Sequence, residues 1–224
     1  MIKEAPRITI PVFLVIANLI PLFSVVFLGW SVFEVMALFW LENVVIGFLN
    51  VARMAVQFFL RKAYEAVLMI PFFCFHYGMF TAVHGIFVIS MFAPGGEEAA
   101  GTVFENMDDW GGPFGLAGVL PAMLSYTGMV YAVIGLFFSH FMSFLVNYIG
   151  KGEYLKTNVM DLMHAPYKRV MILHMTILFG GFLVLSTGEA LWALMLLIVL
   201  KIGIDLVVHL QEHGAFKKNK DESE

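Results

Sequence analysis

The chain has 224 residues, of which 60% are apolar and 13% are charged, about half the usual charged share of ~25%. Its 13 lysine and arginine residues stand against 17 aspartate and glutamate residues. This composition excludes a nucleic-acid-binding protein, a soluble globular domain, a disordered tail and a coiled coil. One cysteine excludes a disulfide scaffold and a cysteine-based zinc cluster. With a mean hydropathy of +0.86, the sequence predicts a membrane protein of one compact domain.

Six segments are apolar enough to form membrane-spanning helices, each of which needs about 20 residues. Pro121 is expected to break a short entry helix off the fourth segment. Residues 1–216 therefore form an all-α, polytopic bundle, and residues 217–224 form a charged tail. In chain order the predicted spans are Ile8–Leu28, Ser31–Phe59, Ala66–Phe92, Gly118–Ile149, Tyr167–Leu185 and Ala190–Leu210.

The positive charges orient this bundle. With the N-terminus placed in the cytoplasm, twelve of the 13 lysine and arginine residues fall on the cytoplasmic side. The remaining one, Lys201, lies inside the sixth predicted span, and the loop over residues 93–113 on the opposite side is acidic. Cytoplasmic loops of membrane proteins carry an excess of lysine and arginine. The sequence therefore predicts a multi-pass protein of the cell membrane with both termini in the cytoplasm.

Several predicted spans contain ionisable side chains, which cost roughly 2.5–3.5 kcal/mol each at the bilayer centre. Counting about 1.5 Å per residue from the cytoplasmic end of each span places His76 and His140 about 15 Å deep. The same count places His174 about 10 Å deep and Asp205 about 12 Å deep. Four helices are thus expected to bring a histidine or an aspartate into one layer on the cytoplasmic side of the midplane.

Imidazoles with a nearby carboxylate are the usual ligands of zinc or non-haem iron. We therefore predict a divalent metal site in this layer. Glu42, at greater depth, is the predicted general base. Lys201 lies on one helix face with Asp205, and it is predicted to polarise a substrate carbonyl or phosphate or to pair with that carboxylate. The predicted metal ligands are His76, His140, His174 and Asp205, with His209 as a replacement for any one of them.

The predicted function is a metal-dependent membrane enzyme, a hydrolase or an oxidase, whose substrate is a lipid or a lipid-linked molecule because the site lies at membrane depth. A proton-coupled transporter that uses the same residues as a relay is one alternative, with Glu34 and His84 in its outer half. A haem or quinone redox protein is another. A divalent metal is preferred to haem, because the histidines within the third predicted span are eight residues apart and too close for two stacked haems. In a fourth reading the histidines only form hydrogen bonds between helices.

Three segments carry a resemblance to a known family. They are Phe39–Asn43 (Phe-Trp-Leu-Glu-Asn), Pro166–Arg169 (Pro-Tyr-Lys-Arg) with His174 and Gly180-Gly181, and the spacing Leu200-Lys-x3-Asp-x3-His209. Together they resemble an uncharacterised family of prokaryotic membrane proteins, a domain of unknown function of about this length. The resemblance covers most of the chain. It implies a six-helix protein of a prokaryotic inner or plasma membrane and supplies no activity.

Overall fold

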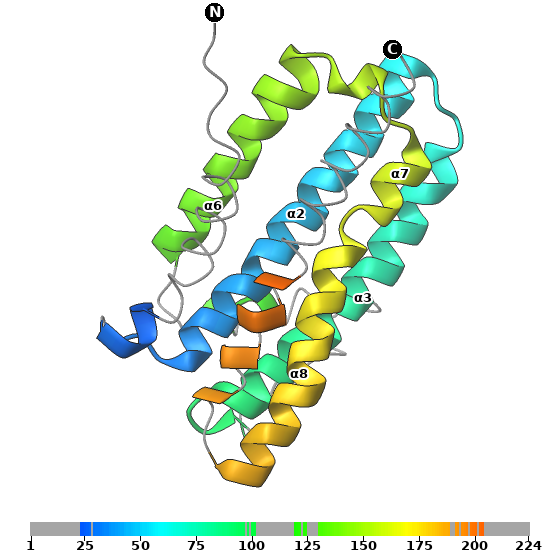
Figure 1. Cartoon of the computed structure of the whole chain (residues 1–224). Helices are drawn as coiled ribbons and strands as arrows, with labels where there is room; N and C mark the ends of the chain where they lie inside the picture. The colour runs from blue at the N-terminus through cyan, green and yellow to red at the C-terminus, as the bar shows by residue number, and fades with distance from the viewer. Residues whose placement is uncertain are drawn as a thin grey trace, which may run out of the picture.

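The computed structural model describes residues 23–27, 29–96, 98, 100–101, 119–121, 123–124, 130–188, 191–192, 194–196, 198–200 and 202–203. All regular structure in these ranges is helical, as the sequence predicts (Figure 1). Most of the first predicted span, much of the acidic loop and the chain from residue 204 onward lie outside the described residues. Lys201, Asp205 and His209 are among the residues that are not described.

Two long helices form the centre of the described fold. Helix α2 (Val32–Arg61) and helix α3 (Ala66–Phe92) match the second and third predicted spans closely. Helix α6 (Val130–Ser143) continues into a π-helix (Phe144–Gly150). A 3₁₀ turn (Glu153–Leu155), helix α7 (Val159–His164) and helix α8 (Tyr167–Thr187) follow.

The described residues support part of the predicted membrane topology. Three of their helical segments are long and apolar enough to cross a membrane. These segments are Val32–Arg61, Ala66–Phe92 and Val133–Gly150. These three segments agree with the prediction of a membrane protein. The other three predicted spans are not among them.

Local sequence signals set the ends of α2. Ser31 and Glu34 form a capping box, in which the Ser31 amide donates to Glu34 Oε2 (2.7 Å) and the Glu34 amide donates to Ser31 Oγ (3.1 Å). At the other end Lys62 adopts a left-handed conformation, with a φ of 56°, and turns the chain into α3. Glu34, which the transporter alternative placed in an outer proton route, is thus a helix-capping residue.

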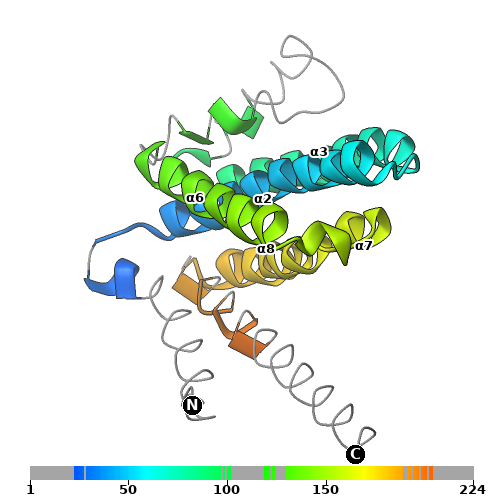
Figure 2. The same ribbon diagram turned by 90° about the horizontal axis from the view of Figure 1, so that it is seen from above.

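Buried contacts fix the register of α2 against α3. Trp40 is fully buried, and its Nε1–H donates to the Thr81 carbonyl at 2.8 Å. The Tyr77 hydroxyl donates to the Asn43 carbonyl at 3.0 Å. Gly47 packs directly on the Tyr77 ring, and a Cβ atom at this position would collide with that ring. A small residue here allows the two helices to approach closely. Viewed from above, α2 lies among α3, α6, α7 and α8 (Figure 2).

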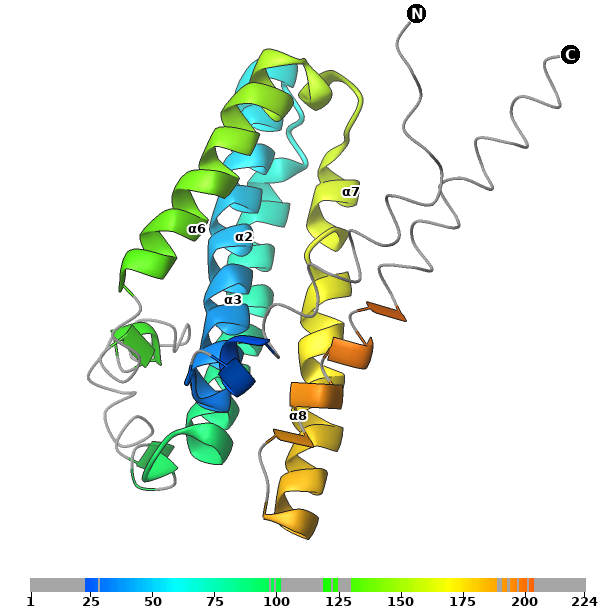
Figure 3. The same cartoon turned by 60° about the vertical axis from the view of Figure 1, so that its left-hand side comes forward.

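Helices α7 and α8 form one column beside α2 and α3, interrupted at Ala165 and Pro166 (Figure 3). The sequence predicts a loop before Tyr167, whereas the structure has a helix there, capped by the Asn158 side chain, which accepts from the Asp161 amide at 2.7 Å. The column therefore begins about 12 Å earlier than predicted, at 1.5 Å per residue. As a result, each residue of α8 lies about two helical turns further along the column than its predicted span implies.

Buried Gln57 ties the connection between α6 and α7 to the end of α2. It is 1% exposed, and its amide nitrogen donates to the Tyr148 hydroxyl and the Tyr154 carbonyl, both at 2.8 Å. It also lies 3.1 Å from Thr157 Oγ1. Arg61 donates to the carbonyls of Tyr154 and Thr157 at 3.2 and 2.9 Å. These bonds hold residues 153–157 against α2.

Replacing Gln57 by leucine is expected to loosen this connection. The net loss of hydrogen bonding is about 1 kcal/mol, which raises the population of the open connection roughly five-fold. Limited trypsin digestion should therefore cut after Lys151 and Lys156 roughly five times faster than in the parent protein. Ser186→Ala, which removes a hydroxyl bonded within its own helix, is the control. Equal cleavage rates in the Gln57→Leu and parent proteins would contradict the proposed tie.

Candidate functional site

Two histidines from neighbouring helices meet inside the bundle. His84 of α3 is buried, and its Nε2 lies 2.7 Å from Nδ1 of His174 on α8. The other ring nitrogen of His84, Nδ1, lies 2.6 Å from the Phe80 carbonyl oxygen. The Phe80 ring packs against both imidazoles, with centroid distances of 4.2 and 5.6 Å. We call His84 and His174 the histidine pair.

The hydrogen bonds of the histidine pair determine its tautomers. A carbonyl oxygen only accepts, so Nδ1 of His84 carries the proton that is donated to Phe80. In a neutral His84, Nε2 is then an acceptor, and Nδ1–H of His174 is the donor to it. The Nε2 atom of His174 keeps its lone pair. This atom is therefore the proton-accepting or metal-binding end of the pair.

His76 has a different partner. Its Nδ1 lies 2.7 Å from the Tyr167 hydroxyl at the start of α8, and its ring stacks on Phe72 with an interplanar angle of 8°. His76 is exposed at the surface of the described structure. Tyr167 in turn packs edge-on against Phe73 and Tyr77. The imidazole thus joins an aromatic cluster that seats the first turn of α8 against α3.

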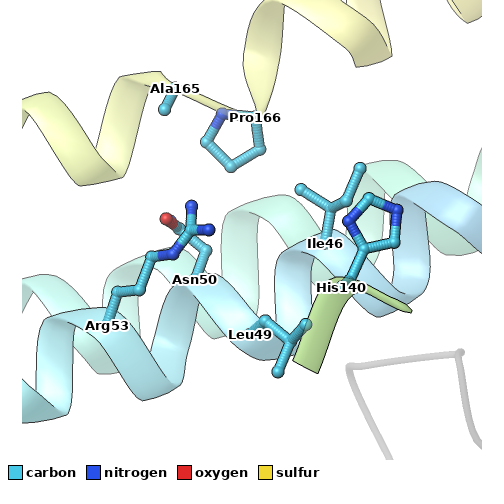
Figure 4. A pocket seen from close by; sticks show the side chains of 7 residues that line it. All are labelled: Ile46, Leu49, Asn50, Arg53, His140, Ala165 and Pro166. Carbon is cyan, nitrogen blue, oxygen red and sulfur yellow. The ribbon is translucent and has the colours of Figure 1, made fainter. Parts of the chain in front are cut away.

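A pocket of about 250 Å³ lies at the interruption between α7 and α8. Helix α2 supplies one wall, α6 contributes His140, and the interruption itself contributes Ala165 and Pro166. Figure 4 shows Arg53 and Asn50 extending from α2 toward these two residues, with His140 beside Ile46. The lining residues are Ile46, Leu49, Asn50, Arg53, His140, Ala165 and Pro166. We call this space the interruption pocket.

Polar atoms in the wall of the interruption pocket have unused hydrogen-bonding capacity. Asn50 is 1% exposed, and its Nδ2 donates to the Leu162 carbonyl at 2.7 Å. Its Oδ1, like Nε of Arg53, is buried with no hydrogen-bond partner in the described part of the chain. The Arg53 guanidinium lies over the Tyr148 ring, 5.6 Å from its centroid. Buried polar groups are normally paired, so unpaired ones lining a cavity point to a bound polar molecule.

Glu42 of α2 and His140 of α6 form a pair next to this pocket. Glu42 Oε1 lies 3.4 Å from His140 Nε2, and both side chains are partly buried. Glu42 is not among the residues that line the pocket, whereas His140 is. The carboxylate thus fixes the position of the imidazole that the pocket presents.

The predicted metal ligands take separate partners in the described structure. His76 contacts Tyr167, His140 contacts Glu42, and His174 contacts His84. Within the described ranges, no three His, Cys, Asp or Glu side chains lie close enough together to hold a metal ion. Asp205 and His209, two of the five predicted ligands, lie outside those ranges, as does the predicted catalytic residue Lys201. The metal site stays a prediction.

The sequence was also compared with known proteins. A family model described as "Family of unknown function (DUF6498)" matches residues 2–222. The chain belongs to this family. The match to DUF6498 confirms the membership in a domain of unknown function that the three sequence segments indicate. No curated protein and no solved structure matches the chain.

Arg53 was predicted only as one of the cytoplasmic positive charges, and its place in the pocket wall was not predicted. No function was predicted for Asn50. A signal for both was present, because Asn43, Asn50 and Arg53 follow one another at spacings of seven and three residues and so share a helix face. The helix interruption that completes the pocket has a weaker sequence signal, which is the proline at position 166.

Proposed function

We propose that the chain is a six-span membrane protein with both termini in the cytoplasm, and that it binds a lipid or a lipid-linked molecule in the interruption pocket. The observation that carries this proposal is a pocket whose wall holds an arginine and a buried asparagine with unpaired polar atoms. Such a wall recognises a polar group, and the pocket belongs to helices of membrane-spanning length.

The outer surface of the bundle supports a membrane location. Large apolar side chains on α2, α3, α6 and α8 point outward, where water would make them costly and lipid would not. Apart from Glu42 and Arg53, the charged residues of these helices lie near helix ends. The exposed apolar residues include Phe48, Phe59, Leu68, Phe138 and Phe182.

The interruption itself supports a binding role. In a bilayer, non-helical backbone is tolerated only where it is buried in protein or lines a cavity, because its polar groups find no water in lipid. Interrupted helices frequently form the substrate sites of membrane proteins for this reason. Ala165 keeps helical dihedrals and donates to the Asp161 carbonyl at 3.0 Å, so the helical ladder breaks at Pro166, which has no N–H. The Leu162 carbonyl, four residues before Pro166, accepts instead from Asn50 Nδ2 at 2.7 Å. Ala165 and Pro166 both line the pocket.

A metal-dependent reaction remains part of the proposal, with its metal at the histidine pair, which does not line the interruption pocket. The lone pair on His174 Nε2 suits a metal, and the bond from His174 Nδ1–H to His84 fixes the orientation of the His174 ring. Elemental analysis of the detergent-purified protein tests this point. About one zinc or iron per chain, lost on replacing His174 by alanine, is the expected result. A metal-free protein would contradict the metal-dependent reaction and leave lipid binding untouched.

The proposed topology predicts opposite accessibility of two loops. After Cys74→Ser, a cysteine in place of Leu155 should react with a membrane-impermeant maleimide only from the cytoplasmic side. A cysteine in place of Pro94 should react only from the outside, because α3 crosses the membrane between the cytoplasmic connection at residues 62–65 and Pro94. Labelling of intact cells and of inside-out vesicles distinguishes the two sides. Labelling of both positions from one side would contradict the topology.

Lipid binding is tested by identifying lipids that copurify with the protein. Ala165→Phe places a ring in the interruption pocket and should remove the bound lipid from the mass spectrum of the gently purified protein. Met160→Phe, on the exposed face of the adjoining helix α7, should retain it. An unchanged lipid content in Ala165→Phe would contradict the proposed site.

The histidine pair favours a second candidate function, proton-coupled transport. His84 and His174 offer a proton-accepting nitrogen in the core, and Glu42 with His140 provides a second ionisable pair on α2 and α6. Ionisable residues at several depths are typical of proton routes. In proteoliposomes with an internal pH-sensitive dye, an imposed membrane potential should acidify the lumen, and His174→Leu should abolish the response. A response equal to that of empty liposomes would contradict transport of protons.

A further inference from the structure

We propose that the interruption pocket binds a phosphoryl group, held by the Arg53 guanidinium and the His140 imidazole, and that Asn50 Oδ1 accepts a hydrogen bond from a hydroxyl of the same ligand. This inference rests on the proposed function, since it names the chemical class of the ligand for that site. It follows from the charges around the pocket, the unpaired atoms in its wall and the depth of Arg53 in α2.

The charge of Arg53 requires a counter-ion. Among the described residues, no carboxylate lies within 4.0 Å of its guanidinium. Glu42, a carboxylate on the same helix, pairs with His140 instead. Glu42 precedes Arg53 by three helical turns, roughly 16 Å along α2. The Tyr148 ring face attracts the cation without neutralising it. A guanidinium that faces a cavity in a membrane-spanning helix therefore needs an anion from the ligand.

The donors around the pocket suit phosphate. Guanidinium forms paired, charge-assisted bonds to phosphate oxygens. His140, from a different helix, adds its Nδ1–H as an imidazolium whose Nε2–H is directed at Glu42. Pro166 lines the pocket at the start of the 21-residue helix α8, whose N-terminal end carries partial positive charge. Asn50 Oδ1, buried and unpaired, is an acceptor and so needs a donor such as a hydroxyl.

The depth of Arg53 agrees with a phospholipid. Helix α2 has 30 residues, about 45 Å, which matches a bilayer with its headgroups. Arg53 lies about 12 Å from the end of the helix at Arg61, which is about 5 Å on the hydrocarbon side of the boundary with the headgroups. A lipid phosphate of the cytoplasmic leaflet reaches this level by a small displacement, with its acyl chains left in the membrane.

The test measures binding to the full chain in dodecyl maltoside, a detergent without phosphate. The probes are dioctanoyl phosphatidic acid, dioctanoylglycerol, glycerol 3-phosphate and inorganic phosphate, each titrated by microscale thermophoresis. Arg53→Gln and His140→Gln should each weaken phosphatidic acid binding by about 10- to 100-fold, the usual effect of losing a charge-assisted contact. Lys62→Gln, which removes an exposed charge at the same end of α2, should leave binding unchanged. Size-exclusion chromatography confirms that each variant is folded.

The outcomes separate the two proposals. Phosphatidic acid binding that depends on Arg53 and His140 supports both. Equal affinity for phosphatidic acid and inorganic phosphate supports the phosphoryl site and overturns the lipid ligand. Equal affinity for phosphatidic acid and dioctanoylglycerol, unchanged in Arg53→Gln, supports the lipid pocket and overturns the phosphoryl site. Failure of every probe to bind overturns both.

Discussion

Replacing Trp40 by alanine is expected to lower the free energy of unfolding by about 3–5 kcal/mol, the largest effect of any single change considered for this protein. The indole is fully buried between α2 and α3, lies against Gly85, and donates to the Thr81 carbonyl. Its removal leaves a cavity that the close-packed helices cannot fill. Titration with sodium dodecyl sulfate in mixed micelles measures the change in unfolding free energy.

The matched control is Trp192→Ala, because that indole is 49% exposed. Its removal should change the unfolding free energy by no more than about 0.5 kcal/mol. Trp40→Phe separates packing from hydrogen bonding, since it keeps most of the ring volume and loses the bond to Thr81, at a cost of about 1–3 kcal/mol. Equal stabilities of Trp40→Ala and Trp192→Ala would contradict the packing of α2 on α3.

Apolar length was enough to predict α2 and α3 from the sequence. Their apolar stretches are long, and a capping box and a charged turn mark their junctions with the neighbouring loops. The α7–α8 column was harder, because Asn158 begins a helix of six residues whose buried face consists of Val159 and Leu162, which is too short to show a helical period. Short helices of this kind are stabilised by packing, here against α2 and α3, and not by local propensity.

The error at α7 explains the difference between the predicted and observed partners of His174. Depth was counted from Tyr167, so His174 was expected in one layer with His76. The column actually starts at Val159, and Tyr167 lies at the level of His76, to which it bonds. His174, two turns further along α8, therefore meets His84. The residue types of the candidate site followed from the sequence, but their partners depended on one short helix.

Breaking the histidine pair is the second change with a large expected effect. His174→Leu leaves Nε2 of buried His84 without its donor, and His84→Leu leaves Nδ1–H of His174 without its acceptor. Each change should cost about 1–3 kcal/mol of unfolding free energy. The double variant should cost less than the two changes together, by about 0.5–3 kcal/mol, because the bond can be lost only once. Additive costs would contradict the bond.

The tautomers of the pair provide a readout that packing alone does not change. In ¹⁵N-histidine NMR spectra of the parent protein, the neutral ring of His84 should carry its proton on Nδ1, since it donates to the Phe80 carbonyl. His174→Leu removes the donor to Nε2 of His84 and should shift that resonance. His164→Leu is the control, because His164 is exposed and bonds within its own helix.

Arg53 lines the interruption pocket and the histidine pair does not, so Arg53→Gln should leave the His84 spectrum unchanged. Ligand binding and proton handling are then separable in one protein, and a variant that changes only one of them assigns its residue to that task.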